Sequence, residues 1–152
     1  MDTLVEPCGG LDVHKAQVTA TVRITEGRAV VEDTKTFATT TRGLLALADW
    51  VASWQVTRVG MEATGVYWKP VYYAVEDTFD TWLLNAQHLK NVPGRKTEVA
   101  DSAWIAQLVA LGLVRPSFVP PKEIRELRDL TRYRKSMTEE RTRAVQRLDK
   151  VL

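Results

Sequence analysis

Four acidic side chains occupy positions that suggest a chemical role. Two lie in apolar stretches, where burying a carboxylate is unfavourable, and two are spaced to lie on one face of a helix. Asp12 lies in an otherwise apolar stretch after a glycine pair, and Glu62 ends a second apolar stretch. An ionised carboxylate in such a strand is unfavourable without a partner. Glu98 and Asp101 are three residues apart, so both are expected to project from one face of the first turn of a helix. The four acids are therefore candidates for a shared site.

Each carboxylate alone also has an ordinary structural explanation. A strand aspartate often accepts local hydrogen bonds, and acidic residues at a helix start compensate the helix dipole. If the strands of Asp12 and Glu62 are neighbours, however, the acids converge and repel one another unless hard cations neutralise them. Magnesium or manganese suits such an all-oxygen site. Two ions about 4 Å apart would activate an attacking oxygen and stabilise a leaving oxygen at phosphorus. The pattern predicts a phosphoryl-transfer site.

The elements that must position these acids follow from hydrophobic periodicity. Val18, Ala20 and Val22 alternate as a half-buried strand does. The expected order is three antiparallel strands (11–14, 18–24, 29–37), a helix (41–54), a strand (58–62), a helix (66–76) and a strand (81–84). The threonine run 39–41 is expected to supply a hydroxyl N-cap for the first helix. Residues 85–95 are expected to form a polar loop, and Thr97 to cap a third helix that closes at Gly112. This order predicts an α/β fold, a mixed sheet flanked by helices.

The C-terminal part differs in composition and in hydrophobic pattern. Residues 117–121 form a proline-containing linker, and residues 122–152 contain no Gly or Pro. Apolar residues step by three and four there, which predicts a long helix with a coiled-coil seam of Leu127, Leu130, Arg134, Met137, Arg141, Ala144, Leu148 and Val151. We expect two domains, residues 1–115 and 116–152. Because the helical pattern runs to the last residue, we expect a longer parent protein.

Composition and charge limit the function classes. No apolar run approaches the roughly 20 residues of a membrane span, and the single cysteine, Cys8, excludes an internal disulfide framework. A cytoplasmic, prokaryotic setting is expected. Residues 1–86 carry a net charge of −4 and residues 87–152 a net charge of +6. The basic C-terminal part favours a polyanionic partner, although solvated basic helices are also common.

Several polar side chains could contact that partner, and each also has a structural reading. A basic loop leads into the acidic helix and could hold a phosphate backbone. Tyr67 and Trp68 could stack on bases, but such aromatics more often pack a helix onto its sheet. The nucleic-acid-binding candidates are His14, Lys15, Lys69, Gln87, His88, Lys90, Arg95, Lys96, Arg128 and Arg132.

Four linked segments carry a family resemblance: GLDVHK, MEATGVYW, LLNAQHLKNVPGRKTEVADSAWIA and SFVPPKEIRELRDLTRYR. In this order and spacing the chain resembles, from Gly10 to Leu152, the DEDD insertion-sequence transposases, also called bridge-RNA-guided recombinases. The resemblance implies an N-terminal RuvC-like domain with an RNase H fold, and a metal-binding tetrad of Asp12, Glu62, Glu98 and Asp101. The third position is usually Asp in that family, so Glu98 departs from the pattern.

The resemblance also implies partners beyond this chain. The family continues into a C-terminal domain that carries a serine nucleophile, absent here, and the full protein would assemble as a dimer or tetramer. The resemblance implies that DNA, a guide RNA and two magnesium or manganese ions are bound, and that this domain alone is incomplete for strand exchange. Ser102 and Ser117 lack the pattern of an activated nucleophile and are interpreted as structural.

Three other functions remain open from the sequence. A Holliday-junction-type nuclease would share the acidic site but cut branched DNA without a guide. A non-catalytic nucleic-acid-binding and dimerisation module would bind independently of metal. An actin-like kinase or ATPase also places Asp at the end of its first strand, but it needs glycine-rich phosphate loops that this chain does not convincingly provide.

Overall fold

The structure, a computed structural model, describes residues 6–95 and 100–152. The chain divides into two compact units, Met1–Ser117 and Phe118–Leu152. Within the described ranges no helix combines the length and apolar character needed to cross a membrane.

The first unit is built on a five-stranded mixed sheet in the order β3-β2-β1-β4-β5. Its strands are β1 (Cys8–Val13), β2 (Gln17–Glu26), β3 (Ala29–Ala38), β4 (Arg58–Glu62) and β5 (Asp80–Leu84). Strands β1, β2 and β3 form an antiparallel meander, whereas β1 with β4 and β4 with β5 pair in parallel. The expected mixed sheet is confirmed, and the strands of Asp12 and Glu62 are direct neighbours.

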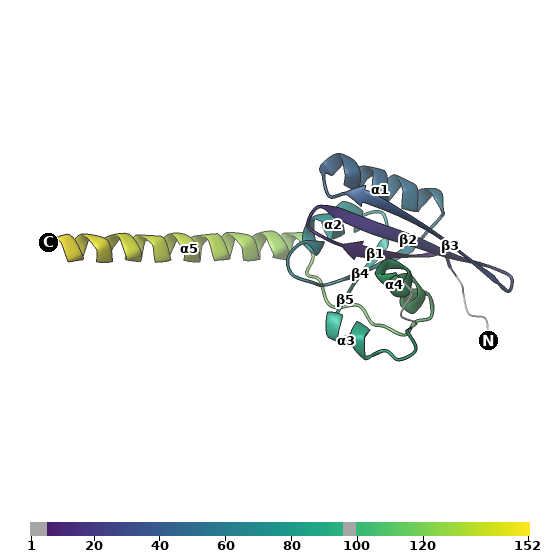
Figure 1. Cartoon of the computed structure of the whole chain (residues 1–152). Helices are drawn as coiled ribbons and strands as arrows, with labels where there is room; N and C mark the ends of the chain where they lie inside the picture. The colour runs from purple at the N-terminus through teal and green to yellow at the C-terminus, as the bar shows by residue number, and fades with distance from the viewer. Residues whose placement is uncertain (1–5, 96–99) are drawn as a thin grey trace. The chain divides into compact units, whose positions relative to one another are not determined.

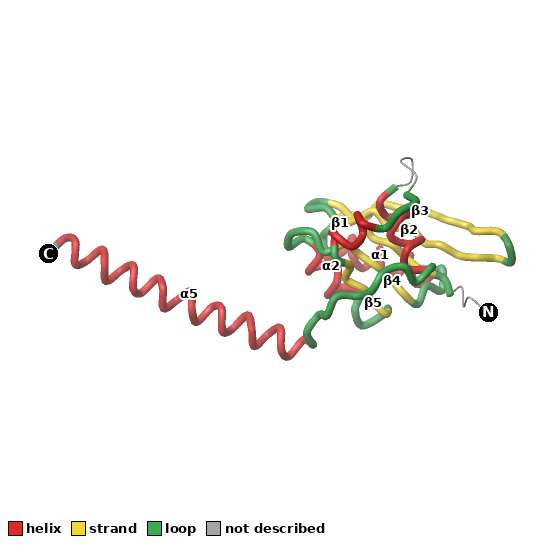
Figure 2. The backbone as a smooth tube through the Cα atoms, turned by 90° about the horizontal axis from the view of Figure 1, so that it is seen from below, coloured by secondary structure: helices red, strands yellow, loops and turns green. Residues whose placement is uncertain are grey.

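The β2–β3 hairpin extends past the other strands of the sheet (Figures 1 and 2). Its turn contains Gly27, which has a positive φ of 62°, a conformation that glycine adopts without steric cost. β2 buries Val18, Ala20 and Val22, as the alternation predicts, while β3 buries only Phe37. The hairpin is therefore anchored to the core mainly through β2.

Helices cover both faces of the sheet (Figure 1). On one side α1 (Thr41–Ser53) buries Leu44, Leu47 and Val51 and packs against β3 and against α2 (Trp68–Val75). The Thr40 hydroxyl caps α1 by accepting a hydrogen bond from the Gly43 amide at 3.0 Å. This cap lies within the threonine run from which it was predicted.

On the opposite side α4 (Asp101–Ala110) packs against β1, β2 and β4. Most of α4 is buried, including Trp104, Ile105 and Leu108. A second short helix, α3 (Ala86–Asn91), adds Leu89 to the same apolar cluster. This layer fixes the start of α4 relative to the sheet.

Four sequence expectations need correction. Residues 85–95 are not all loop, because Asn85 caps α3 by accepting a hydrogen bond from the Gln87 amide at 2.9 Å. The glycines at positions 9 and 10 lie inside β1 instead of preceding it. α2 is shorter than residues 66–76, and α4 begins at Asp101. Thr97, expected to cap that helix, lies outside the described residues.

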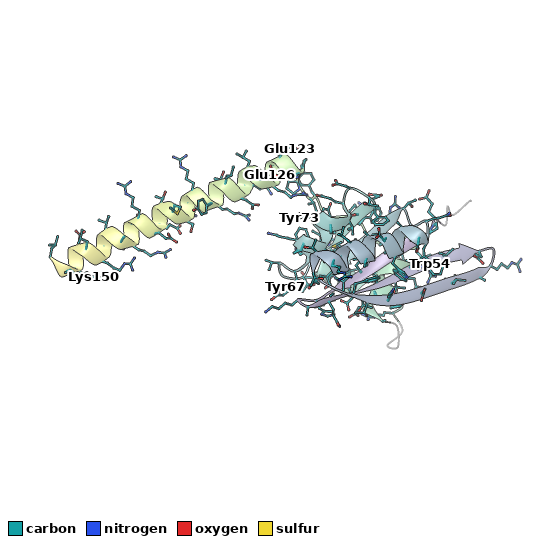
Figure 3. The ribbon with its side chains drawn as sticks, turned by 90° about the horizontal axis from the view of Figure 1, so that it is seen from above. Trp54, Tyr67, Tyr73, Glu123, Glu126 and Lys150 are labelled. Atoms are coloured by element: carbon teal, nitrogen blue, oxygen red, sulfur yellow. The ribbon has the colours of Figure 1, made fainter. Side chains whose placement is uncertain are left out.

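The second unit contains one helix, α5 (Lys122–Val151), whose 30 residues match the predicted long helix. At 1.5 Å per residue it is about 45 Å long. None of its residues is buried, and its side chains project on all sides (Figure 3). The apolar residues of its seam, such as Leu130 at 66% exposure, are therefore open to solvent.

Candidate functional site

Asp12 and Glu62 lie side by side in the register of two neighbouring parallel strands. Gly10 pairs with Gly60 and Leu11 with Met61, so Asp12 and Glu62 are the next residues on β1 and β4. Side chains two residues apart in a strand share a face of the sheet. The two carboxylates therefore lie on the face that holds Gly10 and Gly60, the face covered by α4.

The pair Gly10 and Gly60 lets α4 approach the sheet closely. A Cβ on Gly10 would overlap the Ser102 carbonyl oxygen and the Ala106 amide nitrogen, and one on Gly60 would lie 2.6 Å from the Val109 Cγ2 atom. Both glycines are required by packing and not by a turn. Their absence of side chains places the first turn of α4, with Asp101, over β1.

A buried chain of hydroxyls fixes the same turn of α4. Ser102 Oγ lies 2.8 Å from Thr21 Oγ1, which in turn lies 2.8 Å from Thr34 Oγ1 on β3. Ser102 and Thr21 are both almost completely buried. A buried hydroxyl is costly unless it is hydrogen-bonded, so these contacts hold α4 in register with β2. The structural interpretation of Ser102 is confirmed.

Two of the acids already have basic partners. His14 Nε2 donates to Asp12 Oδ2 over 3.0 Å, and Arg95 donates to Asp101 Oδ1. The Asp12 side chain is 24% exposed and that of Asp101 is 55% exposed, so water screens both contacts. The sequence indicated that His14 shares a face with Asp12, but the Arg95 contact had no sequence signal.

A pocket of about 360 Å³ opens beside these acids. It is lined by Glu62, Ala86, Leu89, Lys90, Val92, Arg95, Asp101, Trp104 and Ile105. The structure thus brings Glu62 and Asp101 to one cavity, although they are far apart in sequence. Asp12 does not line the pocket; it adjoins Glu62 through the strand register.

A family comparison decides what kind of protein carries this arrangement. A family model described as "Transposase", for the DEDD transposases, matches residues 9–152. The chain belongs to the DEDD transposase family. No curated protein sequence matches the transposase chain significantly.

Solved structures show the fold of this transposase unit. A Thermus thermophilus RuvC structure is similar with a TM-score of 0.51 and 13% identity, over 73% of this chain and 99% of that one. T. thermophilus RuvC in complex with a Holliday junction substrate matches with a TM-score of 0.51 and 11% identity, over 74% of this chain and 99% of that one. The transposase unit therefore has the expected RuvC-like, RNase H-type fold.

The donor chemistry of the transposase site fits a hard divalent ion. Asp12, Glu62 and Asp101 offer carboxylate oxygens, the ligands that magnesium and manganese prefer. Within residues 6–95 and 100–152, no three His, Cys, Asp or Glu side chains gather closely enough to hold one ion. Glu98 lies outside the described residues. The ligand set therefore stays a prediction.

The expected nucleic-acid contacts fall on several elements of the transposase chain. His14, Lys15, Gln87, His88 and Lys90 are exposed. Lys69 is half-buried on α2, Arg95 engages Asp101, and Arg128 and Arg132 are exposed on α5. Lys96 lies outside the described residues.

Tyr67 and Trp68 were expected to pack their helix onto the sheet, and only one of them is half-buried. Trp68 is half-buried and lies edge-on to Tyr72, with ring centroids 5.7 Å apart. Tyr67 and Tyr73 instead lie at the surface, 46% and 41% exposed (Figure 3). Packing therefore explains Trp68, whereas the core interpretation is wrong for Tyr67.

Proposed function

We propose that this chain is the metal-dependent catalytic domain of a DNA transposase that cuts and rejoins DNA strands. The proposal rests chiefly on the adjacency of Asp12 and Glu62 at the ends of two parallel strands, in a chain of the transposase family. Carboxylates that lie side by side at the ends of neighbouring strands repel each other, and in this structure His14 is hydrogen-bonded to one of them, Asp12. A bound cation of high charge density relieves that repulsion and gives the arrangement a chemical use.

Asp12, Glu62 and Asp101, together with Glu98, would hold magnesium or manganese. Such ions supply Lewis-acid stabilisation of charge at a phosphodiester and lower the pKa of an attacking hydroxyl or water. The chain itself contributes the fixed placement of its carboxylates: the strand register sets Asp12 beside Glu62, and the packing of α4 on Gly10 sets Asp101. His14 orients the Asp12 carboxylate through its 3.0 Å hydrogen bond.

Arg95 has a second use in this proposal. Its guanidinium engages Asp101 in the structure, and a guanidinium binds phosphate as readily as carboxylate. In this proposal the Arg95 guanidinium would contact a phosphate of the DNA backbone when Asp101 holds a cation. Lys90 and Lys15 are exposed and add positive charge that a phosphate backbone would contact, and His88 is also exposed.

Further partners are proposed from the family membership. The family resemblance favours a guide RNA, a homodimer or tetramer in the full-length protein, and a serine nucleophile supplied from outside this chain. Arg128 and Arg132 on α5 are exposed and suited to phosphate contacts. In this proposal the domain binds metal in its own right but forms only part of the active centre.

Calorimetric titration of the chain with manganese tests the metal-dependent site. Binding in about the millimolar range or tighter is expected, as for exposed carboxylate sites, and it should be lost in Asp12→Asn and Glu62→Gln. Asp49→Asn, at an exposed position on α1, is the matched control and should bind like the wild type. If the wild type binds no manganese, or if all variants bind equally, the catalytic role is excluded for this chain.

A junction-resolving nuclease is the second candidate, favoured by the similarity to RuvC, one structure of which holds a Holliday junction substrate. The two proposals differ in the reaction of this chain alone. A resolving nuclease should cut branched DNA when manganese is added, without RNA. The transposase domain should bind DNA but leave its strands intact until the rest of the protein is present.

A further inference from the structure

We propose that the 360 Å³ pocket beside Glu62 and Asp101 receives one unstacked nucleobase of the DNA substrate. The inference rests on the proposed function and names its substrate class, DNA with an unpaired nucleotide near the site of cleavage. The pocket lies within the size range of small-ligand sites, roughly 300–1,000 Å³.

The lining of the pocket divides into a buried apolar part and an exposed charged part. Leu89, Trp104 and Ile105 are at most 7% exposed. Lys90, Arg95 and Asp101 are exposed. A pocket lined by both apolar and charged side chains suits a ligand that has an apolar part and an ionic part.

A nucleotide has this division of properties. Its base is a flat ring that packs against aromatic and aliphatic side chains, and flipped bases are held in this way by enzymes that act on DNA. Its phosphates are anionic and would meet the Lys90 ammonium and the Arg95 guanidinium. A phosphate alone would gain nothing from Leu89 and Ile105, so the apolar part of the lining points to the base.

The position of the pocket connects the base to the reaction. Glu62 and Asp101 both line it, so a base held there places its own phosphate beside the proposed metal ligands. A base inside a duplex is stacked and paired and cannot enter. The pocket therefore selects DNA that is unpaired or easily unpaired at this nucleotide, since less unstacking is needed.

Ala86 offers a way to fill the pocket without altering a charge. It lines the pocket, is only partly buried and starts α3, so Ala86→Phe should be accepted by the fold while its ring occupies part of the cavity. Val92→Phe is a second filling variant at a half-buried position after α3. Ala46→Phe, at an exposed position on α1, makes the same chemical change away from the pocket.

The experiment compares two labelled duplexes that differ by one bulged nucleotide, which carries a purine analogue whose emission falls when it stacks. Anisotropy titrations are made without divalent ions, and circular dichroism checks that each variant is folded. Wild type and Ala46→Phe should bind the bulged duplex about tenfold tighter than the paired one, with quenched emission. The filling variants should bind both duplexes with the affinity of the wild type for paired DNA, without quenching.

Two results overturn the inference: equal affinity of the wild type for the two duplexes, or an undiminished preference in a folded filling variant. Manganese calorimetry on the same wild-type sample separates this failure from failure of the proposed function. Manganese binding without a preference for the bulge refutes the base pocket alone. A preference for the bulge without manganese binding keeps the pocket and refutes the catalytic role.

Discussion

Gly10 and Gly60 face each other across the parallel strands β1 and β4, and α4 packs on both. This contact links the fold to the site, because Asp12 and Glu62 lie two residues further along the same strands. The helix that needs the glycines also begins with Asp101. The register of β1 and β4 and the packing of α4 on their glycines together determine the relative positions of three acids.

Gly10→Ala is expected to destabilise the chain by at least about 3 kcal/mol, the upper end of the overpacking range. The added Cβ overlaps backbone atoms of Ser102 and Ala106, which cannot move without shifting α4. Chemical denaturation followed by circular dichroism measures the change. Gly9→Ala is the matched control on the same strand, since its Cβ would lie 3.4 Å from the Val59 Cγ2 atom, in ordinary contact. Similar unfolding midpoints for the two variants would contradict the account of α4 packing.

The hydroxyl chain on β2 predicts an order of stabilities. Ser102→Ala removes one hydrogen bond and leaves Thr21 bonded to Thr34, so a loss of about 1 kcal/mol is expected. Thr21→Val removes both contacts and takes the partner from buried Ser102, so it should cost more, about 2–3 kcal/mol. Urea unfolding of both variants tests this order. An equal or reversed order would show that the hydrogen-bonded hydroxyls of Ser102, Thr21 and Thr34 do not hold α4 in place.

Burial raises the pKa of the Cys8 thiol, and this effect outweighs the opposing influence of Arg58 and Arg23. The unfolded state then ionises first as pH rises. The contribution of Cys8 to stability is complete below the ordinary thiol pKa of about 8.5 and is lost as pH rises through the folded value. The stability difference between wild type and Cys8→Ala should shrink above about pH 8.5. A difference that is constant or grows with pH would contradict this assignment.

The seam on α5 predicts self-association of the chain. Leu127, Leu130 and Met137 are 60%, 66% and 50% exposed, and burying one leucine contributes about 1.5–3 kcal/mol. Leu130→Glu should therefore weaken association at least about tenfold in sedimentation equilibrium. Gln146→Glu places the same charge away from the seam and should leave association unchanged. If the chain stays monomeric at all accessible concentrations, the seam on α5 is not sufficient for self-association and the prediction is refuted.

The sequence predicts those parts of the fold whose signals are local. The alternation of Val18, Ala20 and Val22 and the threonine cap of α1 are both confirmed in the structure. The adjacency of β1 and β4 was stated only as a condition, because strand order depends on contacts between distant residues. α3 was missed because a helix of six residues with one buried side chain, Leu89, has no measurable period.

The sequence singled out the acids of the candidate site but not the residues around them. Asp12 and Glu62 became candidates because a carboxylate is conspicuous in an apolar strand, and their place in a metal site stays a prediction. Gly10 resembled strand punctuation in the sequence, and its role appears only once α4 is packed against it. The pocket draws its lining from β4, α3, α4 and the two residues Val92 and Arg95, a set that no spacing along the chain could indicate.

Anomalous diffraction from crystals of this chain soaked in manganese tests the central claim most directly. We predict an anomalous peak coordinated by Asp12, Glu62 and Asp101, with Arg95 displaced from Asp101, and no peak in crystals of Asp12→Asn. Occupied manganese sites elsewhere, with Asp12 still bonded to His14 and Asp101 still bonded to Arg95, would contradict a metal-dependent site at these carboxylates.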